Sequence, residues 1–114
     1  MNSADLYRRY QELQAYVGWN DADAARVNSI AEFLQPALPR LVDDFYTEID
    51  RHPLARQVIT GGQAQIDRLK GSLLRWLQEL LSGPYDVDYA VRRWRVGMRH
   101  VEIGLDQVYT NVAL

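Results

Sequence analysis

The feature that most restricts the fold of this chain is a long amphipathic helix predicted between two glycine-containing breaks. From about Gln63 to Leu81, large apolar residues recur every three or four positions, which is typical of a helix that buries one face. Gly61-Gly62 precedes this segment and Gly83-Pro84 follows it, and both pairs favour turns. The predicted buried face consists of Ile66, Leu69, Leu73, Trp76, Leu77 and Leu80. Such a face requires other helices to cover it.

The remaining segments also show helical periodicity, and none shows the alternation of a strand. We therefore predict an all-α fold of five to six helices in a single domain over residues 1–114, with residues 1–18 as an amino-terminal helical extension. The expected helices run from a cap at Ser3 to Gly18, from a cap among Asn20, Asp21 and Asp23 to Pro36, from Leu38 to before His52-Pro53, from Asp86 or Asp88 to Gly104, and onward from Asp106.

Composition excludes several classes of protein. The 114 residues, 47% of them hydrophobic, suffice for one core. Thirteen Lys and Arg against fifteen Asp and Glu give a net charge of −2, so no general attraction to nucleic acid or an acidic membrane is expected. The absence of cysteine excludes disulfides and thiolate sites. No apolar run approaches the ~20 residues of a membrane span, and the first ten residues do not resemble a signal peptide. We expect a cytoplasmic location.

One histidine is predicted to face the interior of the fold. His100 shares a helical stripe with four other positions, and Gly97 lies one turn before it. A glycine inside a helix costs about 1 kcal/mol relative to alanine, so a flat group passing close to the backbone would explain it. The stripe consists of Tyr89, Arg93, Val96, His100 and Ile103.

The residues alone leave other interpretations open. An inward histidine is more often a packed or capping residue than a ligand. His52 precedes Pro53 at a helix end and is expected to be solvated, and two histidines without cysteine argue against structural zinc. The chain has no paired Glu-x-x-His signature of a di-iron bundle. Arg92, Arg95 and Arg99 share one face of this helix and are most simply solvated, whereas Arg93, nearer the histidine stripe, is a candidate partner for an acidic group of a bound ligand.

Three segments together resemble a known family. Residues 99–105, at their distance from residues 83–86, are similar to the proximal-histidine segment of sensor globins, the haem domains of globin-coupled sensors and their protoglobin relatives. Phe45-Tyr46, followed by an acidic turn and a proline, resembles the distal-tyrosine helix of that family. Residues 66–70, with Ser72 and Trp76, resemble its distal wall. The resemblance covers most of residues 15–110 and implies a globin fold.

The resemblance also implies roles for individual residues. His100 would be the axial ligand to the iron of haem b, and Tyr46 would donate a hydrogen bond to the bound gas from the opposite side. Only the resemblance selects Tyr46 over Tyr89 for this role. The other implied cofactor-binding residues are Phe45, Leu69, Ser72 and Trp76, with Tyr109 beside the proximal histidine.

The implied function is that of an oxygen sensor. The domain would bind O2, or CO or NO, and regulate an attached output domain, with a histidine kinase of a two-component system favoured; the domain itself would not be an enzyme. A homodimer and no nucleic-acid or membrane partner are expected. Family domains continue for about two helices beyond residue 114, so we expect the carboxy-terminal helices to be incomplete. Position 108 is valine where some members have tryptophan.

Two other functions remain as alternatives. A haem-free globin-like interaction module in a signalling complex would keep the helices but would not need His100 or a tyrosine opposite it. A haem enzyme that detoxifies NO or carries out peroxidase-like chemistry is less favoured, because no second histidine or arginine is placed by a motif for cleaving O–O bonds.

Overall fold

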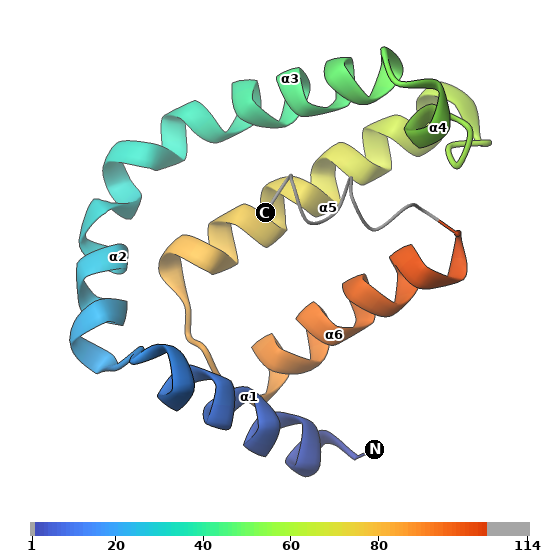
Figure 1. Ribbon diagram of the computed structural model, residues 1–114. Helices are drawn as coiled ribbons and strands as arrows, with labels where there is room; N and C mark the ends of the chain where they lie inside the picture. Colours follow the sequence, from blue (N-terminus) through green and yellow to red (C-terminus); the bar gives the residue numbers. More distant parts are fainter. Residues whose placement is uncertain (1, 105–114) are drawn as a thin grey trace.

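The computed structural model describes residues 2–104, which form helices joined by short turns (Figure 1). No strand occurs in this described range, so the predicted all-α class is confirmed. The expected helix from Asp106 lies outside it. The elements are α1 (Ser3–Val17), α2 (Asp21–Leu34), a 3-10 turn η1 (Gln35–Ala37), α3 (Leu38–Asp50), α4 (Pro53–Arg56), α5 (Gly62–Ser82) and α6 (Val87–Glu102).

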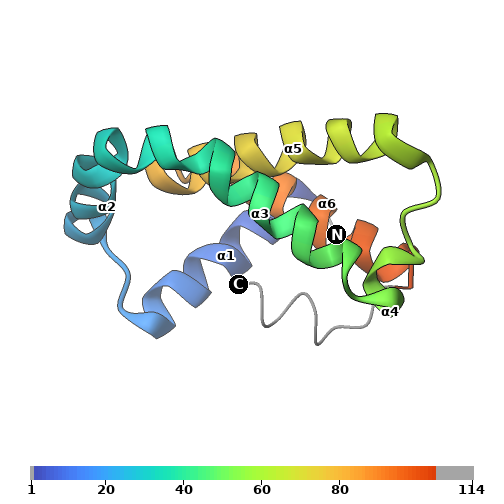
Figure 2. The same cartoon turned by 90° about the horizontal axis from the view of Figure 1, so that it is seen from above.

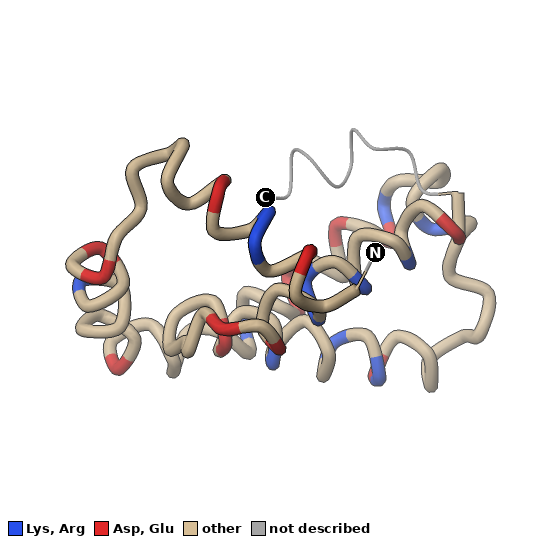
Figure 3. Tube along the Cα trace, turned by 90° about the horizontal axis from the view of Figure 1, so that it is seen from below, with Lys and Arg blue, Asp and Glu red and all other residues tan. Residues whose placement is uncertain are grey.

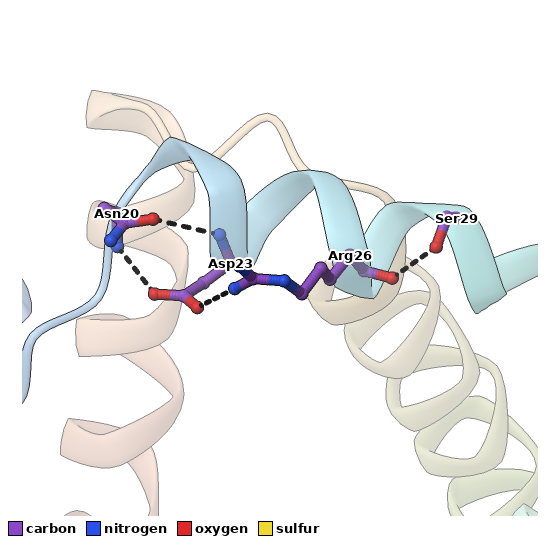
Figure 4. A network of polar contacts seen from close by, with 4 residues as sticks. All are labelled: Asn20, Asp23, Arg26 and Ser29. Carbon is purple, nitrogen blue, oxygen red and sulfur yellow. Dashed lines mark hydrogen bonds and ion pairs between the residues drawn. The ribbon is translucent and has the colours of Figure 1, made fainter.

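The start of α2 is fixed by a reciprocal capping box (Figure 4). The backbone N–H of Asp23 donates to Oδ1 of Asn20 at 3.1 Å, and the backbone N–H of Asn20 donates to Oδ2 of Asp23 at 3.0 Å. Each side chain thus satisfies a backbone donor that the first helical turn leaves without a partner. Arg26 adds an ion pair to Asp23 at 2.7 Å. Asn20 is therefore the cap among the three predicted candidates.

Proline and glycine end the helices near the predicted positions. Pro36 lies in η1, where the chain turns from α2 into α3. Gly18 ends α1 with a φ of +76°, a conformation that costs glycine little. The predicted cap of α1 was wrong by one residue, because the side chain of Asn2, not Ser3, accepts from the backbone N–H of Asp5. At α6 the cap is Asp86, which accepts from the N–H of Tyr89 at 2.9 Å.

The helices pack in two groups. α5 packs against α2 and α3, while α6 packs against α1. An ion pair between Asp43 and Lys70 at 3.2 Å joins α3 to α5. Viewed as in Figure 1, α3 and α6 lie on either side of α5. Acidic and basic residues are interspersed along the helices (Figure 3), and within the described range no helix is both long and apolar enough to cross a lipid bilayer.

Aromatic side chains fill the contact between α1 and α6. Tyr89 is only 5% exposed. The centre of its ring lies 5.9 Å from that of Tyr10 and 5.1 Å from that of Tyr85. Trp19 meets Tyr85 edge to face at 5.6 Å. Aromatic pairs at these distances gain energy beyond their buried area. This cluster fixes the beginning of α6 on α1.

The turn between α5 and α6 is held by two side chains. The hydroxyl of Tyr85 donates to the carbonyl of Leu80 at 2.6 Å, and Nδ2 of Asn28 donates to the carbonyl of Leu81 at 2.5 Å. Both carbonyls belong to the last turn of α5, where no backbone N–H of the same helix is available to donate to them. Asn28 comes from α2, so the end of α5 is tied to a distant part of the chain.

The core of the described residues is small, and much apolar surface remains outside it. No large side chain in the described range is completely buried. On the second half of α6, by contrast, Val101 is 60% exposed and Met98 is 39% exposed. The buried apolar residues are Ala31, Leu38, Val42, Ala55, Tyr89 and Ala90. The amphipathic helix α6 is thus covered by α1 at its beginning and uncovered near its end.

Candidate functional site

His100 lies in the last turn of α6 and is half-buried. Its Nδ1 atom is 2.7 Å from the carbonyl oxygen of Val96, one turn earlier. Since a carbonyl oxygen can only accept, Nδ1 must carry the proton, and Nε2 of the neutral ring then carries a lone pair. No described residue hydrogen-bonds to Nε2. This hydrogen bond is of the kind that leaves Nε2 of a neutral imidazole available to a metal ion.

The backbone beside His100 can accept a flat group. A Cβ atom added at Gly97 would have no other atom within 4 Å, so contacts among the described residues do not require glycine there. The apolar side chains of Val96 and Met98 flank this place in the sequence and are exposed. Together with the lone pair on His100, these features fit a planar, apolar group that carries a metal ion, as haem does.

Phe45 and Tyr46 lie on α3, on the other side of α5 from α6 (Figure 1). Their rings meet edge to face, with 5.3 Å between centroids, and both residues are half-buried. Burial raises the pKa of Tyr46 to about 12. No hydrogen bond joins its hydroxyl to any described residue. Tyr46 is thus a neutral donor at physiological pH whose hydroxyl is available to another group.

The raised pKa of Tyr46 predicts a loss of stability in alkali. The tyrosine of the unfolded chain ionises near pH 10, before the buried one at about 12, so rising pH favours unfolding between these values. Tyr46→Phe should therefore lose less stability than the wild type from pH 10 to 12. Urea unfolding at pH 8, 10 and 11.5 tests this. Tyr10 and Tyr89, whose pKa values burial also raises, remain in both proteins. Parallel losses in the two proteins would contradict the assignment.

Only some of the residues predicted to form the distal wall on α5 are half-buried. Leu69 is half-buried next to Lys70, whose ion pair to Asp43 joins α5 to α3. Ser72 is exposed, and its hydroxyl accepts from Nη2 of Arg75 at 3.3 Å. Trp76 is half-buried nearer the α5–α6 turn, where its ring contacts an arginine. Tyr109 lies outside the described residues. Phe45, Tyr46 and Leu69 are thus half-buried on two helices that pack together, whereas Ser72 is exposed.

Tyr89 is not a counterpart to His100 across a pocket. Both residues belong to α6, and the ring of Tyr89 is buried between Tyr10 and Tyr85. A residue on the same helix as His100 cannot approach a ligand of that histidine from the opposite side. The distal role of Tyr46 stays a prediction.

Arg92, Arg95 and Arg99 are exposed, as the simplest interpretation of the α6 arginines predicts, whereas Arg93 is half-buried. Arg92 pairs with Glu79 at 3.1 Å, and Arg99 pairs with Glu102 at 3.5 Å. The guanidinium of Arg93 lies 3.7 Å from the centre of the Trp76 ring and donates through Nη2 to the Trp76 carbonyl at 2.8 Å. Its Nε and Nη1 atoms are buried. Arg93 thus faces α5 and is not presented to a propionate.

Sequence reasoning missed this arginine contact and the tyrosine cluster. A usable signal was present, because Tyr89 and Arg93 are four residues apart on the apolar stripe of α6, the spacing at which side chains touch. Their partner Trp76 belongs to a different helix, which periodicity within one segment cannot reveal.

Comparison with known proteins identifies the family of this chain. The protein family described as Protoglobin matches residues 6–114. The Heme-based aerotactic transducer HemAT of Halobacterium salinarum is 25% identical over 91 residues, which make up 80% of this chain and 19% of that relative. The chain therefore spans about a fifth of the length of this curated relative. Because the family match extends over nearly the whole all-α chain, this protein belongs to the protoglobin family and has a globin fold.

Proposed function

We propose that this chain is a haem-based sensor domain for O2 or another diatomic gas. The observation that carries the proposal is the hydrogen bond from His100 Nδ1 to the Val96 carbonyl, which leaves the Nε2 lone pair for iron. The aerotactic transducer that resembles this chain is described as heme-based. Haem b, when bound, supplies iron with four pyrrole nitrogens and an open position for a gas.

In this proposal the residues of the chain have separate tasks. His100 would hold the haem iron through Nε2, and the Val96 carbonyl would fix the orientation of its ring. Tyr46 comes from α3 and donates a hydrogen bond toward the gas, which favours polar O2 over CO. Phe45, Leu69, Ser72 and Trp76 form the surrounding wall, and Tyr109 stands near the proximal histidine.

The sensing domain would act on an attached output domain. A change in the hydrogen bonding of Tyr46 on gas binding would bias the packing of α3 against α5, and the output domain would respond to that packing. We favour a histidine kinase of a two-component system as the output, in a cytoplasmic homodimer. The domain itself would bind and signal without catalysing a reaction.

Absorption spectroscopy of the purified protein with added haem tests the proposal. Haem titration should give a saturable Soret band, and the band of the reduced protein should shift on exposure to O2 and again with CO. A folded protein without a saturable band would overturn the haem proposal and favour a haem-free interaction module in a signalling complex.

Tyr46→Phe should increase the rate of O2 dissociation by roughly tenfold, because the hydrogen bond from the Tyr46 hydroxyl to the polar bound gas is lost. Stopped-flow displacement of O2 by CO measures this rate. Tyr7→Phe, on α1, is the matched control and should keep the wild-type rate. An unchanged rate in Tyr46→Phe would transfer the donor role to another residue, with Ser72 the next candidate.

A further inference from the structure

Two arginines provide the side-chain contacts that join α5 to α6. Near the turn, Nε of Arg92 lies 3.1 Å from Oε2 of Glu79. Further along, the guanidinium of Arg93 lies over Trp76 and donates to its carbonyl at 2.8 Å. Beyond Arg93, the described residues show no ion pair, hydrogen bond or ring contact between the two helices. Figures 1 and 2 both show the end of α6 separated from the beginning of α5. Arg93 is thus the last link before the helices diverge.

The surroundings of the Arg93 side chain are unusual for a residue whose only role is packing. Its guanidinium lies over two rings, 3.7 Å from the centre of Trp76 and 4.5 Å from that of Tyr89. Nε and Nη1 are buried without a hydrogen-bond acceptor, and the carboxylate of Glu79 on α5 is engaged by Arg92. Burying a cation in this way is costly, and an apolar side chain of similar volume would avoid the cost. Packing alone therefore does not account for an arginine here.

An arginine at this position can fix the orientation of α6 relative to α5. The contact with the Tyr89 ring lies within α6, so the restraint on this helix comes from Trp76 of α5. Stacking of the planar guanidinium on the Trp76 ring resists rotation of α6 about its own axis, and the bond to the Trp76 carbonyl resists sliding of α6 along α5. His100 lies seven residues, or about 10 Å, further along the same stripe of α6. A rotation of the helix at Arg93 would turn the imidazole by the same angle.

We propose that Arg93 is a positioning residue that sets the direction in which His100 presents Nε2 to haem iron, by clamping α6 onto Trp76 of α5. The inference rests on the proposed haem function. It assigns a role in iron coordination to a residue two helical turns from the ligand.

The iron–histidine stretching band in the resonance Raman spectrum of the reduced, haem-loaded protein tests the proposal. In Arg93→Gln this band should shift and broaden, and haem should transfer to an excess of apomyoglobin about tenfold faster than from the wild type. Arg95→Gln removes the same charge from an exposed position on the same helix and should match the wild type. A variant that merely destabilised the fold would lower the midpoint of unfolding but leave the band of the folded protein in place.

A second variant protects the test against a folding defect in Arg93→Gln. Arg93→Lys keeps the positive charge but loses the planar guanidinium that stacks on the Trp76 ring. It should shift the same band, because an ammonium group cannot reproduce this stacking. Equal bands in the wild type, Arg93→Gln and Arg93→Lys would overturn the positioning role while leaving haem binding intact. Absence of the iron–histidine band from the wild type would overturn the proposed haem ligation itself.

Discussion

Replacing His100 with alanine should abolish stable haem binding, because the neighbouring side chains offer no second imidazole. The only other histidine, His52, lies at the start of α4, on a different helix from His100. Haem titration followed at the Soret band measures the loss, and we expect at least a hundredfold weaker binding with the removal of the metal ligand. Circular dichroism of the haem-free protein should remain helical, since His100 is only half-buried.

Two comparisons make this result specific. His52→Ala should bind haem as the wild type does. In His100→Gly, added imidazole should restore the five-coordinate reduced spectrum, because the free base can occupy the space of the deleted ring. A normal reduced spectrum in His100→Ala without added imidazole would contradict the assignment of the axial ligand.

Replacing Tyr89 with alanine should cause the largest loss of stability among single changes outside the proposed haem site. Tyr89 is only 5% exposed. The substitution removes its ring, which contacts Tyr10, Tyr85 and Arg93. Truncation of a buried aromatic residue to alanine costs about 3 to 5 kcal/mol. Urea unfolding of the haem-free protein, followed by circular dichroism, measures the difference in unfolding free energy.

Tyr16→Ala is the matched control for this prediction. Tyr16 is also a tyrosine in a helix, but it is 87% exposed on α1, so its truncation should change the unfolding free energy by less than about 0.5 kcal/mol. Similar losses in the two variants would show that the aromatic cluster does not hold α6 on α1.

The succession of helices was predictable because its signals are local. Asn20 and Asp23 can form a capping box only at a helix start, and Gly83-Pro84 cannot continue a helix. The error at α1 was also local, since Asn2 and Ser3 are adjacent and both side chains can cap. Periodicity placed the interior face of each helix but not which helix would cover it.

The candidate site was predictable to a smaller extent. The half-buried position of His100 followed from its stripe, and the resemblance selected Tyr46 on a different helix. The clamp of Arg93 on Trp76 did not follow, because it joins residues 17 positions apart through a backbone carbonyl that no sequence pattern marks. The exposure of Ser72 also depends on how α5 is rotated against its neighbours, which the pattern of a single helix cannot fix.

The hydrogen bonds that hold the α5–α6 turn restrict where relatives of this protein can gain or lose residues. Asn28 and Tyr85 bond to consecutive carbonyls at the end of α5, so the spacing between residue 81 and residue 85 is fixed from two directions. An insertion there would pull one side chain away from its carbonyl and rotate the start of the helix that carries His100. The Gly61-Gly62 turn has no comparable tie to another helix within the described residues. We therefore expect natural insertions to collect before α5 and to avoid the turn after it.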